Sequence, residues 1–288
     1  MKFYGSIEAG GTKFVCAIGN DSLEIVNRMS FPTTTPNDTL VQVFKFFDEY
    51  ELEAIGIGSF GPVDLNPKSP TYGYITTTPK PGWGNFGFLD MIKNRYDIPI
   101  TFTTDVNAAA FGENMLGAAT DVDSCIYLTV GTGIGGGAVI NGQLIEGYSH
   151  PEMGHILIKR HPEDIFSGTC PYHHDCLEGM ASGPAIEKRF GIKAENLKSD
   201  HPAWKFESHY LAQALMNYIL ILSPEKIILG GGVMEQKQLF PLIRTALKSM
   251  LNGYVELPDL DTYIVPPKLD NNAATLGCLM LAKQAIEK

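Results

Sequence analysis

The sequence has no run of lysine or arginine, and its 32 acidic residues outnumber its 22 basic ones, which gives a formal net charge of -10. Proteins that bind nucleic acid or anionic membranes need a basic surface, so the composition speaks against both kinds of partner. The chain also lacks any stretch of about 18 consecutive apolar residues. Its first residues, MKFYGSIEAGG, have neither the apolar core nor the cleavage site of a signal peptide. We therefore expect a soluble, cytoplasmic protein.

Cysteine is scarce, and its five copies are scattered and odd in number: Cys16, Cys125, Cys170, Cys176 and Cys278. A disulfide framework would show an even number of cysteines at regular spacings. The pattern instead predicts buried thiols and a metal site.

The length and composition predict two α/β lobes. A single core rarely grows past roughly 250 residues, and this chain has 288, of which 44% are hydrophobic. Both halves open with a strand, a glycine turn and a second strand, at 6–18 and at 127–140. This repetition indicates two similarly built lobes.

Other elements follow from local patterns. Thr35 can cap a helix that starts with Pro36, because Asp38 completes a capping box. Further strands are expected at 54–57, 100–103 and 227–229. One helix is expected to start at 105, and others to run through 211–222, 239–250 and 272–285. A loop is expected at 58–87. A loop of that length is often functional.

Three glycine-rich turns lie at strand ends: 9–13, 131–137 and 230–232. Glycine lets backbone N–H groups approach an anion closely, and Lys13 and Thr132 add a charge and a hydroxyl. A single such turn is most simply a tight hairpin. Three turns together favour a phosphate site.

The residues Gly131, Gly133 and Gly136 also match a dinucleotide-binding fingerprint. That fingerprint requires a helix directly after the glycines. A strand and an Asn141-Gly142 hairpin signal follow here, which excludes the dehydrogenase interpretation.

Asp105 lies where a strand ending near Thr104 meets a helix. Aspartate is a favoured helix N-cap. An unshifted carboxylate can also accept the proton of a hydroxyl during phosphoryl transfer. Both interpretations stay open from the residues alone.

The segment 150–178 is rich in metal-ligand residues. The spacing Cys170-x-x-His173-x-x-Cys176 supplies three ligands, and a distant histidine can complete a tetrahedral zinc set. The alternative is two free thiols with surface histidines. Gly168 and Pro171, which bend the chain, favour zinc.

At these residues the sequence resembles the ROK family of sugar kinases and regulators, most closely its bacterial fructokinases. Seven motifs in order carry the resemblance: EAGGTK (8–13), GSFGPVD (58–64), TDVNAAA (104–110), LTVGTGIGGG (128–137), PEMGH (151–155), CLEG (176–179) and ILGGG (228–232). The resemblance implies an actin-like, ribonuclease-H-like two-lobe fold with an active-site cleft. We expect a smaller lobe at 1–116 with a C-terminal helix at about 272–288, a larger lobe at 117–271 with the zinc loop, and a homodimer.

The resemblance also implies roles for single residues. Asp105 is expected to be the catalytic base, and Gly61, Asn107, Glu152, His155 and Glu178 are expected to bind the sugar. ATP is expected at Gly10, Gly11, Thr12, Lys13, Thr132, Gly133, Pro184, Gly231 and Gly232. Zinc is expected at His155, Cys170, His173 and Cys176, and Mg²⁺ at Glu8.

Three residues depart from the commoner family pattern. Glu8 stands where many relatives have aspartate, His173 replaces a cysteine and leaves His174 as a rival ligand, and Thr104 replaces the asparagine of glucokinases. A site that loses a hydrogen-bonding amide discriminates differently between sugars. We therefore expect less strict recognition of glucose.

The resulting hypothesis is ATP-dependent phosphorylation of fructose to fructose 6-phosphate, with Mg²⁺ and a structural zinc. The alternatives are a broader hexokinase that accepts mannose or glucose, a sugar-binding regulator, and a non-metabolic actin-like ATPase. Only seven residues precede Glu8, which leaves no room for the helix-turn-helix of a regulator. The acidic and histidine cluster of Glu152, His155 and Glu178 speaks against the ATPase.

Overall fold

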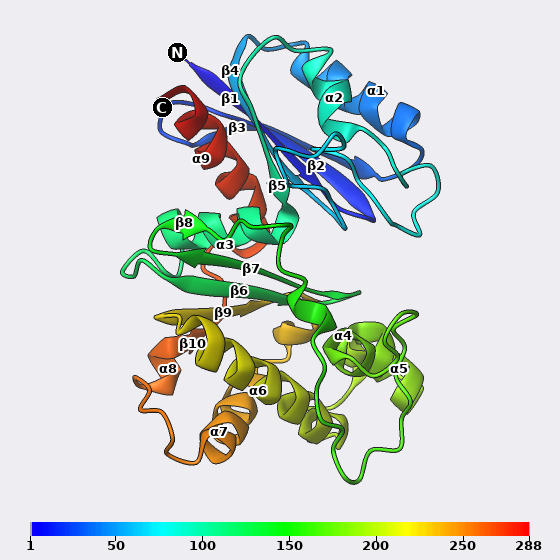
Figure 1. Ribbon diagram of the computed structural model, residues 1–288, viewed down its shortest axis with the longest axis vertical. Helices are drawn as coiled ribbons and strands as arrows, with labels where there is room; N and C mark the ends of the chain where they lie inside the picture. Colours follow the sequence, from blue (N-terminus) through cyan, green and yellow to red (C-terminus); the bar gives the residue numbers. More distant parts are fainter. Residues whose placement is uncertain (1, 288) are drawn as a thin grey trace. The chain divides into compact units, whose positions relative to one another are not determined.

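The computed structural model describes residues 2–287 (Figure 1). The chain forms two compact units. The first comprises the residues up to Gly117, 143–151 and those from Leu269, and the second comprises 118–142 and 152–268. The sequence placed 143–151 in the second lobe, but the structure groups this segment with the first unit. One cause is His150, whose Nε2 accepts a hydrogen bond from the Val63 N–H at 3.2 Å.

The first unit contains a five-stranded sheet. Its strands are β1 (Phe3–Ala9), β2 (Lys13–Gly19), β3 (Ile25–Pro32), β4 (Leu52–Ser59) and β5 (Ile100–Thr104), in the order β3-β2-β1-β4-β5. Strands β1, β2 and β3 pair antiparallel, whereas β1, β4 and β5 pair parallel. The carboxyl ends of β1, β4 and β5 therefore meet at one edge of the sheet.

Helices cover both faces of this sheet (Figure 1). They are α1 (Pro36–Phe47), α2 (Phe88–Lys93), α3 (Asp105–Leu116), the 3₁₀ turn η4 (Asp270–Asn272) and α9 (Ala273–Glu287). Thr35 caps α1 as predicted, since its hydroxyl accepts a hydrogen bond from the Asp38 N–H at 3.3 Å. Strand β3 and helix α2 were not predicted.

Helices α3 and α9 cross in close contact. A side chain on Gly277 would place its Cβ 1.8 Å from the carbonyl oxygen of Ala108, so glycine is required at the crossing. The contact fixes α3 against the sheet. Asp105, the first residue of α3, is thereby held at the end of β5.

The second sheet repeats the plan of the first. Its strands are β6 (Cys125–Val130), β7 (Ile134–Ile140), β8 (Gln143–Leu144), β9 (Lys226–Gly230) and β10 (Ile264–Val265), in the order β8-β7-β6-β9-β10. Strands β6 and β7 pair antiparallel, and β6, β9 and β10 pair parallel, as their counterparts do in the first sheet. The prediction of two similarly built α/β lobes is confirmed.

The helices described in the second unit lie between β8 and β10 in sequence. They are η1 (Met153–His155), α4 (Leu177–Ala181), α5 (Gly183–Phe190), η2 (Ala194–Asn196), α6 (Ala203–Leu222), η3 (Gly232–Glu235), α7 (Leu239–Leu251) and α8 (Leu260–Tyr263). Helix α6 begins eight residues before the apolar stripe that starts at Leu211. It packs against α7.

The glycine loop predicted at 131–137 is shorter in the structure. Only 131–133 form the turn, and Gly135, Gly136 and Gly137 pair with β6 as part of β7. Close packing explains glycine inside a strand, since a Cβ on Gly136 would lie 2.6 Å from the Met153 sulfur. The predicted turn after β7 is confirmed, with positive φ at Asn141 and Gly142.

Candidate active site

Asp105 begins helix α3 but does not cap it. The N-cap is Thr104, whose hydroxyl accepts a hydrogen bond from the Asn107 N–H at 3.1 Å. The Asp105 carboxylate accepts from the Val106 N–H at 2.9 Å. The capping interpretation of Asp105 is therefore wrong, because the neighbouring threonine does that work.

Asn107 lies two residues after Asp105 and is buried. Its amide nitrogen donates to the Thr103 hydroxyl at 3.1 Å. Its side-chain oxygen has no hydrogen-bond partner within residues 2–287. A buried acceptor without a donor is costly, and such groups mark sites that are completed by another molecule or by movement.

Glu8 lies near the carboxyl end of β1 and is half-buried. Burial raises the pKa of its carboxyl above the ordinary value, and a hydrogen bond from the Thr275 hydroxyl opposes that rise. This bond, to Oε2, is 2.8 Å long and comes from helix α9. The carboxylate is thus oriented by a fully buried threonine.

The turn from Gly10 to Lys13 joins β1 to β2. The Gly10 N–H donates to the Lys13 carbonyl at 3.0 Å, and the Thr33 hydroxyl donates to the Gly10 carbonyl at 2.6 Å. Gly11, Thr12 and Lys13 are exposed. The backbone of the turn is therefore fixed, while the Lys13 ammonium stays accessible to an anion.

Gly61 lies in the long loop after β4, which belongs to the same unit as Asp105. The loop carries bridges between Val63 and Ile75 and between Ile75 and Phe86. It is anchored on a buried aromatic cluster by Trp83, whose indole N–H donates to the Thr34 carbonyl at 2.8 Å. The predicted long loop is thus ordered by hydrogen bonds.

A pocket of about 370 Å³ in the second unit brings together three residues predicted to bind ATP, namely Thr132, Pro184 and Gly232. Gly133 and Gly231 are the sequence neighbours of two lining residues, Thr132 and Gly232. No sequence pattern predicted Lys193, Glu187 and Glu195, which line the same pocket. These three residues lie in α5 and in the segment after it, which carries no periodic pattern.

Glu178, on α4, contacts the turn between β6 and β7. Its Oε2 accepts a hydrogen bond from the Ile134 N–H at 2.9 Å. Its Oε1 lies 3.9 Å from Nε2 of His155. The structure therefore brings together two of the three predicted sugar ligands of this unit. Glu152 precedes η1, three residues before His155.

Four side chains form a compact group of metal-ligand atoms: His155, Cys170, His173 and Cys176. Their ligand atoms all lie within 4.8 Å of one another. Nδ1 of His155 lies 3.7 Å from the Cys170 sulfur and 3.6 Å from the Cys176 sulfur. The set is the one predicted from sequence.

These distances fit a tetrahedral zinc site. Zinc–sulfur bonds of about 2.3 Å and zinc–nitrogen bonds of about 2.0–2.1 Å imply sulfur–nitrogen separations of about 3.6 Å. Burial and the neighbouring Cys170 raise the pKa of the Cys176 thiol to about 11. A bound cation supplies the charge that makes such a thiol a thiolate.

His174, the rival ligand, is not in this group. Its backbone has a positive φ of 57° and its N–H donates to the Cys170 carbonyl at 3.0 Å. The left-handed conformation closes the loop between the two cysteines. All five cysteines have free thiols.

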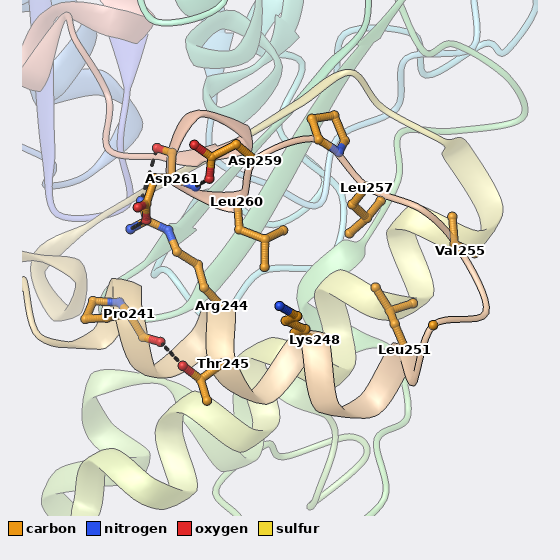
Figure 2. Close-up of a pocket in the computed structure, with 12 residues that line it drawn as sticks. Pro241, Arg244, Thr245, Lys248, Leu251, Val255, Leu257, Asp259, Leu260 and Asp261 are labelled. Atoms are coloured by element: carbon orange, nitrogen blue, oxygen red, sulfur yellow. Dashed lines mark hydrogen bonds and ion pairs between the residues drawn. The ribbon is translucent and has the colours of Figure 1, made fainter.

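A larger cavity of about 540 Å³ lies between α7 and the segment that leads into α8 (Figure 2). It contains no residue predicted to bind a ligand. Two charged residues of its lining are paired, since Arg244 contacts Asp261 at 2.5 Å and also donates to the Ile264 carbonyl at 2.7 Å.

Across residues 2–287, every helix is too short or too polar to traverse a lipid bilayer.

A sequence model described as the ROK family matches residues 4–285. The chain belongs to the ROK family. It is similar to a fructokinase of Pediococcus pentosaceus, which is 51% identical over 98% of each chain. A fructokinase of Lactococcus lactis subsp. cremoris is likewise 51% identical, over 99% of each chain.

The fold is that of ROK sugar kinases. A ROK family glucokinase from Streptomyces griseus, in complex with glucose and AMPPNP, superposes with a TM-score of 0.77 at 24% identity. The superposition covers 98% of this chain and 99% of that one. The expected actin-like α/β architecture with two sheets is thus confirmed.

Proposed function

We propose that this chain is a fructokinase, an ATP:D-fructose 6-phosphotransferase. The likeness at 51% identity to two fructokinases, over nearly the whole of each chain, carries the proposal. A preparation supplied with Mg-ATP should release ADP only when a sugar is added, and fructose should be the best of fructose, mannose and glucose. Sugar-independent release of ADP would contradict the proposal.

Asp105 acts as the general base. The oxygen of the sugar 6-hydroxyl bonds to the γ-phosphorus, the bond to the β–γ bridging oxygen breaks, and ADP leaves. The proton of the hydroxyl passes to the Asp105 carboxylate late in the reaction. The start of α3 supports this role because Thr104 caps the helix, which leaves the carboxylate for chemistry. Gly61 and Asn107 bind the sugar.

Glycine turns carry the contacts to the nucleotide. The pocket lined by Thr132, Pro184 and Gly232 supports a nucleoside site. Backbone N–H groups of Gly11, Thr12 and Gly133, with the Lys13 ammonium, bind the phosphates, while Gly10 closes the turn and Gly231 shapes the pocket. Bound Mg²⁺ would neutralise charge on the phosphates. Glu8 would hold it directly or through water, since Thr275 orients its carboxylate.

Glu152, His155 and Glu178 bind the hydroxyl groups of the sugar. His155 serves two partners with its two ring nitrogens: Nδ1 faces the two cysteine sulfurs, and Nε2 faces Glu178. Zinc held by His155, Cys170, His173 and Cys176 would be structural, because four protein ligands leave no open position. It would fix the ring of His155.

We further propose that the protein works in the cytoplasm as a homodimer, with small-molecule substrates and no nucleic-acid or membrane partner. The net charge of -10 supports the last point. Leu157, Ile165 and Tyr172 are exposed around the metal ligands, and a dimer could cover them. Light scattering on the purified chain should give twice the mass of 31.5 kDa.

A further inference from the structure

Asp164 and Arg189 form an ion pair inside the second unit. Nη2 of Arg189 lies 3.1 Å from Oδ2 of Asp164, and the two side chains are only 6% and 3% exposed, respectively. Taking two charges out of water costs several kcal/mol per ion, which only good geometry and further hydrogen bonds offset. Neither residue has a role in the proposed reaction.

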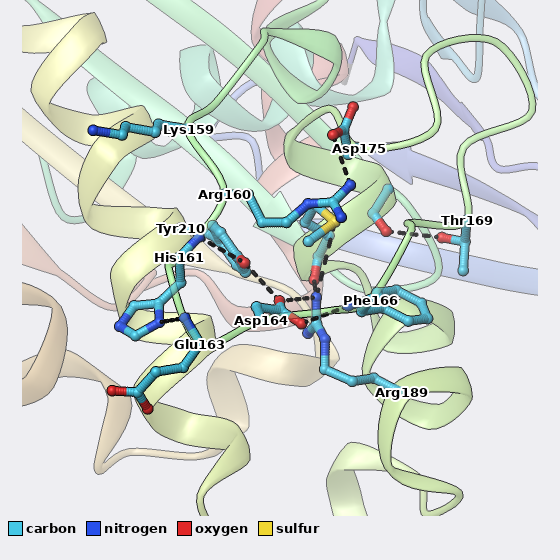
Figure 3. Close-up of polar contacts among 12 residues, drawn as sticks. Lys159, Arg160, His161, Glu163, Asp164, Phe166, Thr169, Asp175, Arg189 and Tyr210 are labelled. Carbon is cyan, nitrogen blue, oxygen red and sulfur yellow. Dashed lines mark hydrogen bonds and ion pairs between the residues drawn. The ribbon is translucent and has the colours of Figure 1, made fainter.

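The surroundings of Asp164 provide those hydrogen bonds (Figure 3). The Tyr210 hydroxyl, on α6, donates to Oδ2 at 2.6 Å. The Phe166 N–H donates to Oδ1 at 3.0 Å. Both carboxylate oxygens are therefore occupied, and the pair is tied to α6 as well as to α5.

Arg189 has further partners. Its Nη2 donates to the Met180 carbonyl, in α4, at 2.9 Å. Its guanidinium carbon lies 4.5 Å from the centre of the Phe166 ring, close enough for a cation–π contact. One side chain thus joins α5 to α4 and to the segment that carries Asp164.

That segment is part of the metal loop, which we define as residues 155–176, from the first zinc ligand to the last. On either side of Asp164, Glu163 forms an exposed ion pair with Lys205 and Ile165 is 96% exposed, so neither neighbour is buried as Asp164 is.

The loop also contacts α6 through Lys159, which exchanges hydrogen bonds with Gln213, and through His161, whose N–H donates to the Tyr210 hydroxyl. The Asp164–Arg189 pair adds a buried link to α5.

The other end of α5 lines the nucleotide pocket. Gly183, Pro184 and Glu187 belong to its lining, and the Gly183 N–H donates to the Gly131 carbonyl at 2.8 Å. Arg189 lies five residues after Pro184 on the same helix, about 7.5 Å along its axis at 1.5 Å per residue. A shift of Arg189 would move the pocket wall.

We propose that the Asp164–Arg189 pair positions helix α5, so that the metal loop sets the shape of the nucleotide pocket. This inference rests on the proposed function, which places ATP in that pocket and zinc in that loop. Both residues are positioning residues. The metal site would thus support nucleotide binding in addition to the sugar ligands that flank it.

Asp164→Asn tests the proposal in the full chain loaded with zinc. It keeps the size of the side chain but removes the charge that pairs with Arg189. Titration calorimetry with AMPPNP should show the Kd raised at least fivefold with zinc content unchanged. Steady-state kinetics should show a raised KM for ATP and a kcat within twofold of wild type.

Glu163→Gln is the matched control, because it breaks an ion pair one residue away. That pair, with Lys205, has a separation of 2.7 Å and joins side chains that are 66% and 54% exposed. Exposed pairs contribute little, so the Kd for AMPPNP should stay within twofold of wild type.

Tyr210→Phe covers the case in which Asp164→Asn fails to fold. It removes the hydroxyl that donates to Asp164 and accepts from the His161 N–H, and we expect a Kd raised two- to threefold. A lower melting temperature with unchanged Kd in the folded variants would overturn the inference and leave a purely structural pair. Wild-type protein that fails to bind AMPPNP would overturn the nucleotide assignment, and the inference with it.

Discussion

The Thr104 hydroxyl accepts a hydrogen bond from the Asn107 N–H and so caps the helix that begins with Asp105. Hence the start of α3 does not depend on the Asp105 carboxylate. The Oδ1 atom of that carboxylate accepts a hydrogen bond from the Val106 N–H, and an amide oxygen can accept the same bond. Chemistry and stability are therefore separable at this position.

Asp105→Asn should abolish nearly all turnover while the protein stays folded. A positioned general base contributes roughly 10²–10⁴-fold, and an amide cannot take the proton. The melting temperature and the Kd for AMPPNP should stay close to those of wild type. Asp90→Asn, in the first turn of α2, is the control and should keep full activity. A turnover of Asp105→Asn within tenfold of wild type would remove the base assignment.

His173 and His174 provide a matched pair for the metal site. Only His173 belongs to the group of ligand atoms, although the two residues are adjacent. His173→Asn should lose most of the zinc, whereas His174→Asn should keep it, because asparagine tolerates the positive φ at that position. Elemental analysis of protein purified without chelator measures the difference. Equal zinc contents, or none in wild type, would contradict the site.

Glu207 should make stability depend on pH. Burial raises the pKa of its carboxyl well above the ordinary value of 4.5, and neither oxygen has a hydrogen-bond partner among residues 2–287. At a pH between the ordinary pKa of the unfolded state and the raised pKa of the folded state, the folded state keeps a proton that the unfolded state has lost. The free energy of unfolding of the wild type therefore falls as pH rises. Glu207→Gln has no such proton, so its free energy of unfolding should increase relative to that of wild type as pH rises.

Urea unfolding at several pH values from about 5 to about 8 measures this difference. The exposed Glu49→Gln is the control, and its curve should run parallel to that of wild type. If the plot of unfolding free energy against pH for Glu207→Gln ran parallel to that of wild type, Glu207 would titrate alike in the folded and unfolded states, which would contradict the prediction.

Much of the fold is predictable from local pattern. Strands β6 and β9 are rich in branched apolar residues, and Thr35 with Pro36 marks a helix start. Strand β3 escapes prediction because it is exposed at the sheet edge and carries Asn27, Arg28 and Ser30, which give no alternation. Its position depends on pairing with β2, which is not encoded in its own residues.

The zinc set is predictable because three of its ligands lie within seven residues. Lys193 and the Asp164–Arg189 pair are not, since each depends on segments brought together by the folded chain. Gly135 to Gly137 mislead for a different reason, because glycine weakens a strand intrinsically. At Gly136 the closeness of Met153 explains why glycine is present.

Thr104 also bears on sugar preference. Its hydroxyl is committed to the helix cap, and the residue is buried, so it does not replace the amide of glucokinases as a free hydrogen-bonding group. Sites that lose one polar partner can discriminate strongly between sugars. Fructose should therefore be preferred to glucose by at least tenfold in kcat/KM, a difference of about 1.4 kcal/mol.

Competition between fructose and glucose at equal low concentrations, with Mg-ATP and identification of the products by NMR, tests the central claim most directly. The account predicts that fructose 6-phosphate dominates by at least tenfold. A product dominated by glucose 6-phosphate would contradict the fructokinase assignment, and the absence of any phosphorylated sugar would contradict the kinase itself.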